Sequence, residues 1–335
     1  DLRPQGHDII RTWLFSTMVR SNFEHRTAPW AHAALSGWIL DPDRKKMSKS
    51  KGNVVTPIGL LEENGSDGVR YWAASGRPGT DTAFDPQQMK VGRRLAIKLL
   101  NASKFALTFA GDPTGDVTEP IDRDLLWSLA ELIDDATNAF DSFDYARALE
   151  RTEAFFWTFC DDYLELVKTR AYGEGEHSTA SAAGTASAAN ALAAALSALQ
   201  RLFAPFLAFS AEETWSWWME GSVHRAPWPT SQRLRSLAGD DAVGASRLAV
   251  AGHVLTEIRR AKSDAKVSMR ASVQQVVVAD TAERLAALAL AADDVAAAGS
   301  VAELLTEQLG SEQLGSEQPD TVGRSASVVV VLADD

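Results

Sequence analysis

The sequence has a single cysteine and few long apolar stretches. Cys160 is the only cysteine among 335 residues, so it can form neither an internal disulfide nor a cysteine-based metal site. No apolar run reaches the roughly 18 residues that a membrane-spanning helix needs, which argues against a membrane protein. The chain begins without methionine and without the pattern of a signal peptide. These absences favour a reducing cytoplasm, and we expect the chain to begin inside a longer protein.

Acidic residues are in excess, but they are unevenly distributed. The net charge of −12 argues against a general nucleic-acid binder. Residues 1–110 contain 16 Lys and Arg against 10 Asp and Glu, whereas the remaining residues contain 17 against 35. The basic excess is greatest over residues 44–51, which hold five cations. Because such a run is more often a solvated loop than a site, its residue pattern has to decide between the two.

Three segments of different character follow one another along the chain. Short apolar stretches, one of them over residues 34–40, alternate with helical patterns up to residue 110. A stretch rich in Gly, Pro and Asp over residues 111–120 marks a domain boundary, and long helical patterns follow it. Val-rich stretches from residue 271 onward predict strands around an Ala-rich helix over residues 282–292.

Two low-complexity stretches predict loops. Residues 173–189 are rich in Gly, Ser, Thr and Ala, which indicates a flexible loop. Residues 307–316 contain the same five residues twice in tandem, which is most simply an expanded surface loop. We assign no function to either stretch.

The strongest chemical signal is the stretch Lys46-Met47-Ser48-Lys49-Ser50. Two ammonium groups three residues apart, together with hydroxyl and loop N–H groups, can hold a polyphosphate. Donors of this kind stabilise the charge that develops on a departing pyrophosphate. The sequence has no Gly-x-x-x-x-Gly-Lys-[Ser/Thr] motif, so this is not a P-loop. Taken alone, the stretch would be interpreted as an exposed basic loop.

The whole stretch, with the apolar residues before it and Gly-Asn-Val-Val-Thr-Pro after it, resembles the KMSKS loop of class I aminoacyl-tRNA synthetases. The resemblance implies a Rossmann-like catalytic fold whose loop closes over ATP and its Mg²⁺. It implies ATP contacts at Gly37, Ile39 and residues 46–50. Lys46 and Lys49 match the phosphate-binding lysines of the family, and we expect Lys49 to contribute most to catalysis.

A second segment, residues 5–13, contains Gly6, Asp8 and a following helical pattern. By default Asp8 would be a helix cap, because a carboxylate stabilises the free N–H groups of a helix start. The segment is also similar to the Gly-x-Asp-Ile-Ile-x-x-Trp stretch of the valine-specific members of the class. That similarity implies that Gly6 and Asp8 border the ribose of the adenylate. It also implies an aliphatic amino-acid pocket lined by Ile9, Ile10 and Trp13.

Two further segments resemble the same family. Residues 65–72 are similar to the Gly-Ala-Asp-Ala-Leu-Arg stretch that joins the nucleotide fold to the anticodon domain, although Asp67 as a helix cap and Arg70 as a surface charge would look the same. Residues 202–215 resemble an aromatic stretch of the helical anticodon domain, and we interpret most of these aromatics as core.

A basic stretch follows one of the helical patterns near residue 260. It could be a solvated face, but in this context contact with tRNA phosphates is at least as good an interpretation. The residues concerned are Arg259, Arg260, Lys262, Lys266 and Arg270.

The predicted architecture is a multidomain α/β plus all-α protein. Residues 1–110 form the C-terminal part of a Rossmann-like class I catalytic fold, residues 111–270 a helical-bundle anticodon-binding domain, and residues 271–335 a small α/β segment. The resemblance implies ATP-dependent attachment of valine to tRNA(Val) through valyl-adenylate. Because the chain has no His-x-Gly-His motif and no editing domain, we expect it to be inactive alone. The alternatives are an isoleucine or other branched-chain tRNA ligase, and a non-catalytic tRNA-binding module.

Overall fold

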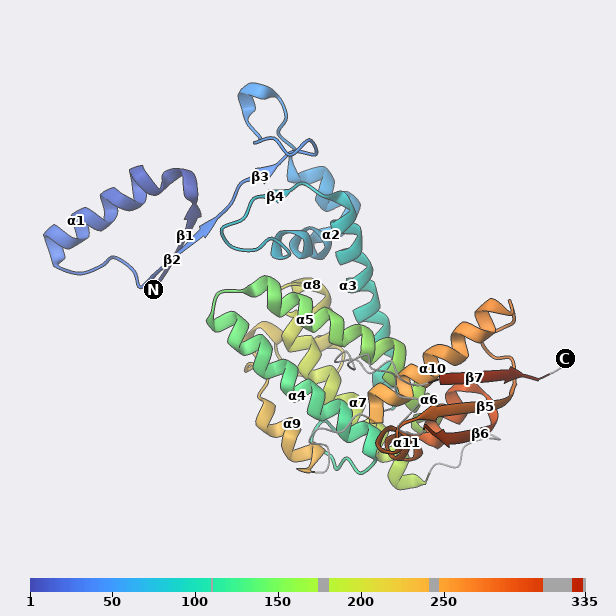
Figure 1. Cartoon of the computed structure of the whole chain (residues 1–335). Helices are drawn as coiled ribbons and strands as arrows, with labels where there is room; N and C mark the ends of the chain where they lie inside the picture. The colour runs from blue at the N-terminus through green and yellow to red at the C-terminus, as the bar shows by residue number, and fades with distance from the viewer. Residues whose placement is uncertain (110, 174–180, 241–246, 310–326, 334–335) are drawn as a thin grey trace. The chain divides into compact units, whose positions relative to one another are not determined.

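The computed structural model describes residues 1–109, 111–173, 181–240, 247–309 and 327–333, except for the side chain of Lys49. Contacts within the chain divide it into two compact units. Unit 1 comprises residues 1–101, 134–153 and 200–228, and unit 2 comprises residues 102–133, 154–199 and 229–335 (Figure 1). Each unit combines three separate stretches of the chain, so this division does not test the three consecutive domain ranges, which stay a prediction.

Unit 1 begins with two parallel strands joined through a helix. β1 pairs in register with β2 from Leu2–His32 to Gly6–Ser36. A second short parallel pair joins β3 to β4. Parallel strands with a helical crossover are the repeating unit of nucleotide-binding α/β folds. The elements are β1 (Leu2–Gly6), η1 (His7–Ile9), η2 (Ile10–Leu14), α1 (Phe15–His25), β2 (His32–Ser36), β3 (Ile39–Leu40), η3 (Lys49–Lys51) and β4 (Thr82–Ala83).

The single strand expected over residues 34–40 is divided at Gly37. β2 ends at Ser36, and β3 begins at Ile39. A Cβ atom at Gly37 would lie 2.0 Å from the carbonyl oxygen of Thr80, so only glycine permits this approach. Beyond it the backbone changes neighbours, since the N–H of Thr82 donates to the carbonyl oxygen of Trp38 over 2.9 Å.

Most of the remaining chain is helical, as the sequence predicts for residues 111–270. The longest helices bury continuous apolar faces: Leu95 and Leu99 of α3, and Leu125 and Leu129 of α4, are fully buried. The helices are α2 (Pro57–Ala74), α3 (Pro86–Ala106), η4 (Leu107–Phe109), α4 (Pro120–Asp141), α5 (Tyr145–Thr158), η5 (Phe159–Tyr163), α6 (Leu164–Tyr172), α7 (Ala182–Phe203), α8 (Ala208–Ser216), η6 (Val223–Arg225), α9 (Ser231–Ala238) and α10 (Arg247–Asp264).

Helix α7 differs from two expectations: that residues 173–189 form a loop, and that no apolar stretch is long enough to span a membrane. It begins at Ala182, inside the stretch expected to be a loop up to residue 189. The Ser181 hydroxyl accepts a hydrogen bond from the N–H of Gly184 over 3.0 Å, and the alanines that follow have the highest helix propensity. The helix is also long and apolar enough to cross a membrane, but 72% of its apolar stretch is buried inside the protein. These properties fit a core helix.

The C-terminal part of unit 2 is a small α/β structure, as predicted. β5 is central, parallel to β6 and antiparallel to β7. The elements are β5 (Val273–Asp280), α11 (Ala282–Ala289), α12 (Ala292–Gly299), β6 (Val301–Gln308) and β7 (Ser327–Leu332). The sequence analysis missed α12 and β6, because the Glu-rich, largely exposed β6 lacks the apolar pattern of a strand. Most of the tandem repeat lies outside the described residues.

A buried ionic network connects five helices of unit 2, namely α4, η5, α6, α7 and α12. The Arg170 guanidinium on α6 donates to both carboxylate oxygens of Asp122 on α4, each over 2.8 Å. It also donates to Asp294 on α12 over 2.9 and 3.0 Å. Tyr163 and Ser187 donate their hydroxyls to Asp122 over 2.8 and 2.7 Å. Although burial alone would lower the pKa of Arg170, its hydrogen bonds to the two carboxylates raise it.

Candidate nucleotide site and basic helix

The segment that contains Gly6 and Asp8 lies at the carboxyl end of β1, and the lysine-rich loop follows β3. Gly6 ends β1 and is followed at once by His7 and Asp8, while Trp38 lies just beyond the end of β2. The strands are parallel, so these residues come to the same edge, where α/β folds bind ligands. His7 Nδ1 lies 3.2 Å from the carbonyl oxygen of Ser36, and its ring is 4.5 Å from that of Trp38.

Lys46 of the lysine-rich loop reaches this edge. Its ammonium nitrogen lies 3.7 Å from Asp8 Oδ2 and 3.8 Å from the centroid of the Trp38 ring. The side chains of Lys46 and Asp8 are both about half exposed, so this ion pair is weak and open to exchange with a ligand. Gly6 leaves room for the carboxylate, because a Cβ there would lie 2.8 Å from Asp8 Oδ1.

The loop itself is held by Asp41 and Asn53. The buried Asp41 carboxylate accepts hydrogen bonds from Asn53 Nδ2 and from the N–H of Lys45, both over 2.7 Å. These bonds, that from Asn53 first, lower the pKa of Asp41. Asn53 Oδ1 accepts in turn from the N–H of Ser48 over 2.9 Å. The sequence analysis gave neither residue a role, although Asn53 belongs to the stretch that carries the resemblance.

The loop presents a cation and two hydroxyls to solvent or ligand. Met47 and Ser48 are half-buried, whereas Ser50 is exposed. The hydroxyl oxygens of Ser48 and Ser50 lie 3.2 Å apart. The backbone of Lys49 begins η3, and its side chain lies outside the described residues. Ammonium and hydroxyl groups in this arrangement can bind phosphate oxygens.

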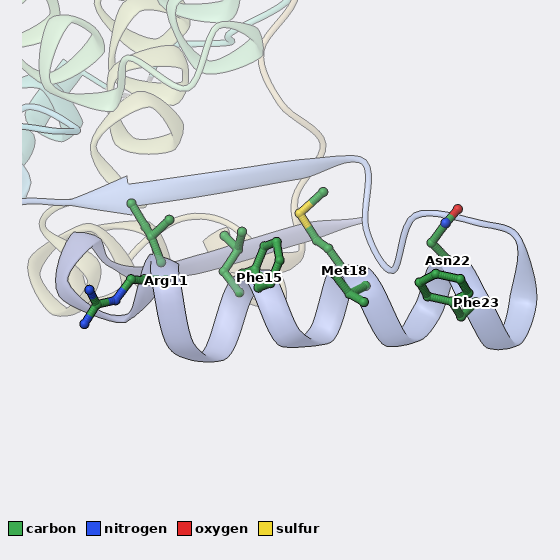
Figure 2. A pocket seen from close by; sticks show the side chains of 8 residues that line it. Arg11, Phe15, Met18, Asn22 and Phe23 are labelled. Carbon is green, nitrogen blue, oxygen red and sulfur yellow. The ribbon is translucent and has the colours of Figure 1, made fainter.

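The residues predicted to line an adenylate and amino-acid pocket have different surroundings. Ile10 lines an apolar groove along α1, together with Arg11, Leu14, Phe15, Met18, Val19, Asn22 and Phe23 (Figure 2). Trp13 lies outside this groove, stacked on Trp30 at 5.8 Å. Ile9 is exposed, and half of Ile39 is exposed. The roles of these residues stay a prediction.

Asp67 and Arg70 have partners that the sequence did not suggest. Asp67 is buried and accepts hydrogen bonds from the N–H groups of Phe209 and Ser210 over 3.1 and 2.7 Å, so it caps α8 and not its own helix. Arg70 donates to the carbonyl oxygens of Pro205 and Phe206 over 2.7 and 3.1 Å, so it is not a free surface charge. Within unit 1, residues 65–72 are thus bonded to the aromatic stretch.

The basic residues predicted to contact tRNA differ in their surroundings. Arg259 donates to the carbonyl oxygen of Asp161 over 2.5 Å and lies 3.9 Å from Glu165. Arg260 is largely exposed, at 3.8 Å from Glu257 and 4.0 Å from Asp264.

Among the residues predicted to contact tRNA, Lys262 is buried. Its side chain is 1% exposed, and its ammonium donates to the carbonyl oxygens of Met269 and Gly299 over 3.0 and 2.8 Å. Burial lowers the pKa of Lys262. Since the ammonium is used inside the protein, Lys262 supports the fold, and we do not retain it as a phosphate contact. Its place on a basic helix gave no sign of this.

Two family models match the chain over the regions just described. Residues 1–85 match the class I tRNA synthetases for isoleucine, leucine, methionine and valine, and residues 122–278 match the anticodon-binding domain of tRNA ligases. The chain belongs to the class I tRNA synthetases, and the predicted fold class is confirmed.

Within that class, the chain is similar to valine–tRNA ligases. It is 60% identical over 313 residues to the valine–tRNA ligase of Thermobifida fusca, covering 92% of this chain and 34% of that protein. It is 57% identical over 326 residues to that of Salinispora tropica, covering 92% and 37%. The chain thus spans about a third of the length of these curated relatives.

Solved structures show the same fold at low identity. A LeuRS–tRNA–LeuAMS ternary complex from Agrobacterium radiobacter K84 aligns with a TM-score of 0.55 and 22% identity, over 70% of this chain and 29% of that one. The Mycobacterium tuberculosis methionyl-tRNA synthetase bound by methionyl-adenylate aligns with a TM-score of 0.54 and 22% identity, over 72% and 46%.

Proposed function

We propose that the chain supplies the ATP loop and the anticodon-binding part of a valine–tRNA ligase. In this reaction the valine carboxylate attacks the α-phosphate of ATP, pyrophosphate leaves, and a terminal ribose hydroxyl of tRNA(Val) attacks the adenylate. The observation that carries the proposal is the position of Lys46, 3.7 Å from Asp8 at the carboxyl ends of two parallel strands. The identity to valine–tRNA ligases supports valine as the amino acid.

Lys46 and Lys49 act as electrostatic groups in the proposed reaction. When ATP binds, its phosphates offer Lys46 a stronger partner than the single exposed carboxylate of Asp8. Asp8 is then free to accept hydrogen bonds from the ribose. The lysines stabilise charge that grows on the departing pyrophosphate, which lowers the barrier to adenylate formation.

Mg²⁺ accompanies ATP and pyrophosphate in the proposal. Among the described residues, no group of three or more His, Cys, Asp or Glu side chains is arranged to hold a metal ion. In the proposal the ion arrives with the nucleotide substrate, and the phosphates are its ligands.

The helical part is proposed to bind tRNA. Arg259 and Arg260 on α10, with Lys266 and Arg270 just after it, supply positive charge, and phosphate contacts of this kind make binding depend on salt. Anticodon bases in single strands are read by stacking and by edge hydrogen bonds. The predicted division at residues 110 and 270 and the predicted cytoplasmic location belong to this proposal.

The experiment that tests the proposal has two arms. The 335-residue chain is titrated with valine tRNA, isoleucine tRNA and an anticodon-swapped variant across a salt series. Binding that follows the valine anticodon is expected. The full-length polypeptide that includes this chain is then assayed for ATP–pyrophosphate exchange with valine, isoleucine and leucine. Exchange that requires isoleucine would reassign the amino acid, and tRNA binding without any exchange would favour a non-catalytic binding module.

A further inference from the structure

The lysine-rich loop is closed at its base by the side chains of Asp41 and Asn53. Asp41 lies just before the loop and Asn53 just after it, and Asn53 Nδ2 donates to Asp41 Oδ2 over 2.7 Å. Asp41 also exchanges two hydrogen bonds with Lys45, because it accepts the N–H of Lys45 and donates its own N–H to the Lys45 carbonyl oxygen over 2.8 Å. An antiparallel bridge between Leu40 and Lys46 also lies at this base of the loop.

The Asn53 side chain also contacts the backbone of the lysine-rich motif itself. Its Oδ1 accepts the N–H of Ser48 over 2.9 Å, and its Nδ2 lies 3.3 Å from the carbonyl oxygen of Lys46. These two contacts bracket Met47, so they determine the backbone direction from which the Lys46 side chain leaves. Gly52 has a φ of 68°, a left-handed turn that costs glycine little and brings Asn53 back toward the motif.

We propose that Asp41 and Asn53 form a clasp that positions Lys46 for the phosphates of ATP. The inference rests on the proposed function and deepens it by adding two positioning residues. The clasp needs an amide at position 53, because this side chain donates to Asp41 and accepts from Ser48 at the same time. A carboxylate of the same size would still accept from Ser48, but it would face Asp41 with a like charge. In this proposal both residues act through Lys46 and not by contact with the nucleotide.

The alternative is that the clasp only helps the loop to fold. The two explanations differ in how the clasp and Lys46 combine. If Asn53 acts through Lys46, its replacement matters little once the Lys46 ammonium has been removed. If Asn53 acts only on folding, the fold-reductions in kcat caused by the two replacements multiply, because independent effects add in free energy.

The test uses ATP–pyrophosphate exchange by the full-length polypeptide that includes this chain. Asn53→Asp should lower kcat by about ten- to a hundredfold, the range expected for losing a hydrogen bond to a charged group. The KM for valine should stay unchanged, because the clasp does not touch the amino acid. The exchanged pair D41N/N53D restores a donor opposite a carboxylate, so it should recover most of the activity lost in Asn53→Asp.

The double variant N53D/K46A supplies the decisive comparison. Adding Asn53→Asp to Lys46→Ala should lower kcat by less than about threefold. Asn138→Asp, which introduces the same change on an exposed position of α4, is the matched control and should leave the exchange rate unchanged. In the 335-residue chain, Asn53→Asp should also speed hydrogen exchange at the N–H groups of Lys45 and Ser48.

The possible results separate the clasp from the function on which it rests. A wild-type polypeptide that shows no valine-dependent exchange would refute the proposed function. A wild type that is active overturns the clasp if Asn53→Asp is near normal, or if its loss multiplies fully with that of Lys46→Ala. An exchanged pair no better than the product of its single variants would overturn it as well.

Discussion

Replacement of Arg170 by methionine tests the energetic reasoning about the buried network of unit 2. All five N–H donors of Arg170 are used, four by Asp122 and Asp294 and one by the carbonyl oxygen of Gly184 over 3.1 Å. The side chains of Arg170 and Asp294 are 10% and 12% exposed, and that of Asp122 is fully buried. Methionine fills similar space but leaves two buried carboxylates without their cation. Breaking a buried ion pair in this way costs about 3–5 kcal/mol.

The loss should depend on pH with a definite sign. Burial raises the pKa of Asp294, although the charge of Arg170 opposes the shift. Without Arg170 this pKa rises further. A carboxyl whose folded pKa exceeds its unfolded value makes the folded state bind more protons, so stability falls as pH rises through the folded pKa. The deficit of Arg170→Met relative to the wild type should therefore be larger at pH 8 than at pH 5.

Hydrogen exchange is the suitable assay, because a chain of two units need not unfold in one step. Protection of the amides of α6 reports unit 2 alone, and Arg170→Met should reduce it by about two to four orders of magnitude. The matched control is Arg260→Met, which removes a largely exposed arginine on α10 and should cost less than about 1 kcal/mol. Equal losses in the two variants, or a loss that does not change with pH, would refute the reasoning.

Three further outcomes are expected. Lys49→Ala should lower valine-dependent ATP–pyrophosphate exchange of the full-length polypeptide by about a hundredfold or more while tRNA binding is retained, and near-normal exchange would remove its assigned role. Changing Arg259 and Arg260 to Ala should weaken tRNA binding and reduce its salt slope by about 0.7–0.9 per lost phosphate contact; an unchanged slope would return both to the solvated-face interpretation. Gly37→Ala places a Cβ 2.0 Å from the Thr80 carbonyl oxygen and should cost about 1–3 kcal/mol, measured by thermal unfolding and by exchange of the Thr82 amide, whereas a fully stable variant would contradict the close approach.

Features that depend on neighbouring residues could be predicted from the sequence. The Lys46–Ser50 stretch, the helical content of residues 111–270 and the central strand β5 all follow from short patterns of side chains. The start of α7 at Ala182 was missed because a stretch rich in Ser, Thr, Gly and Ala is compatible with both a loop and a helix, and the Ser181 cap selects the helix. Strand β6 was missed because its pairing with β5 replaces the apolar pattern that an isolated strand would need.

By itself, the sequence determined the class of protein and the chemical groups of the lysine-rich loop, because a loop motif keeps its residues wherever the chain places it. Only the tertiary structure decided which of those groups meet. Lys46 contacts Asp8, which lies far away in the sequence, because two parallel strands end at the same edge. Lys262 lies inside the protein while Arg260, two residues away, is exposed, because α10 packs against its neighbours on one side only. Burial and long-range contact are properties of packing, and a short pattern of residues carries neither.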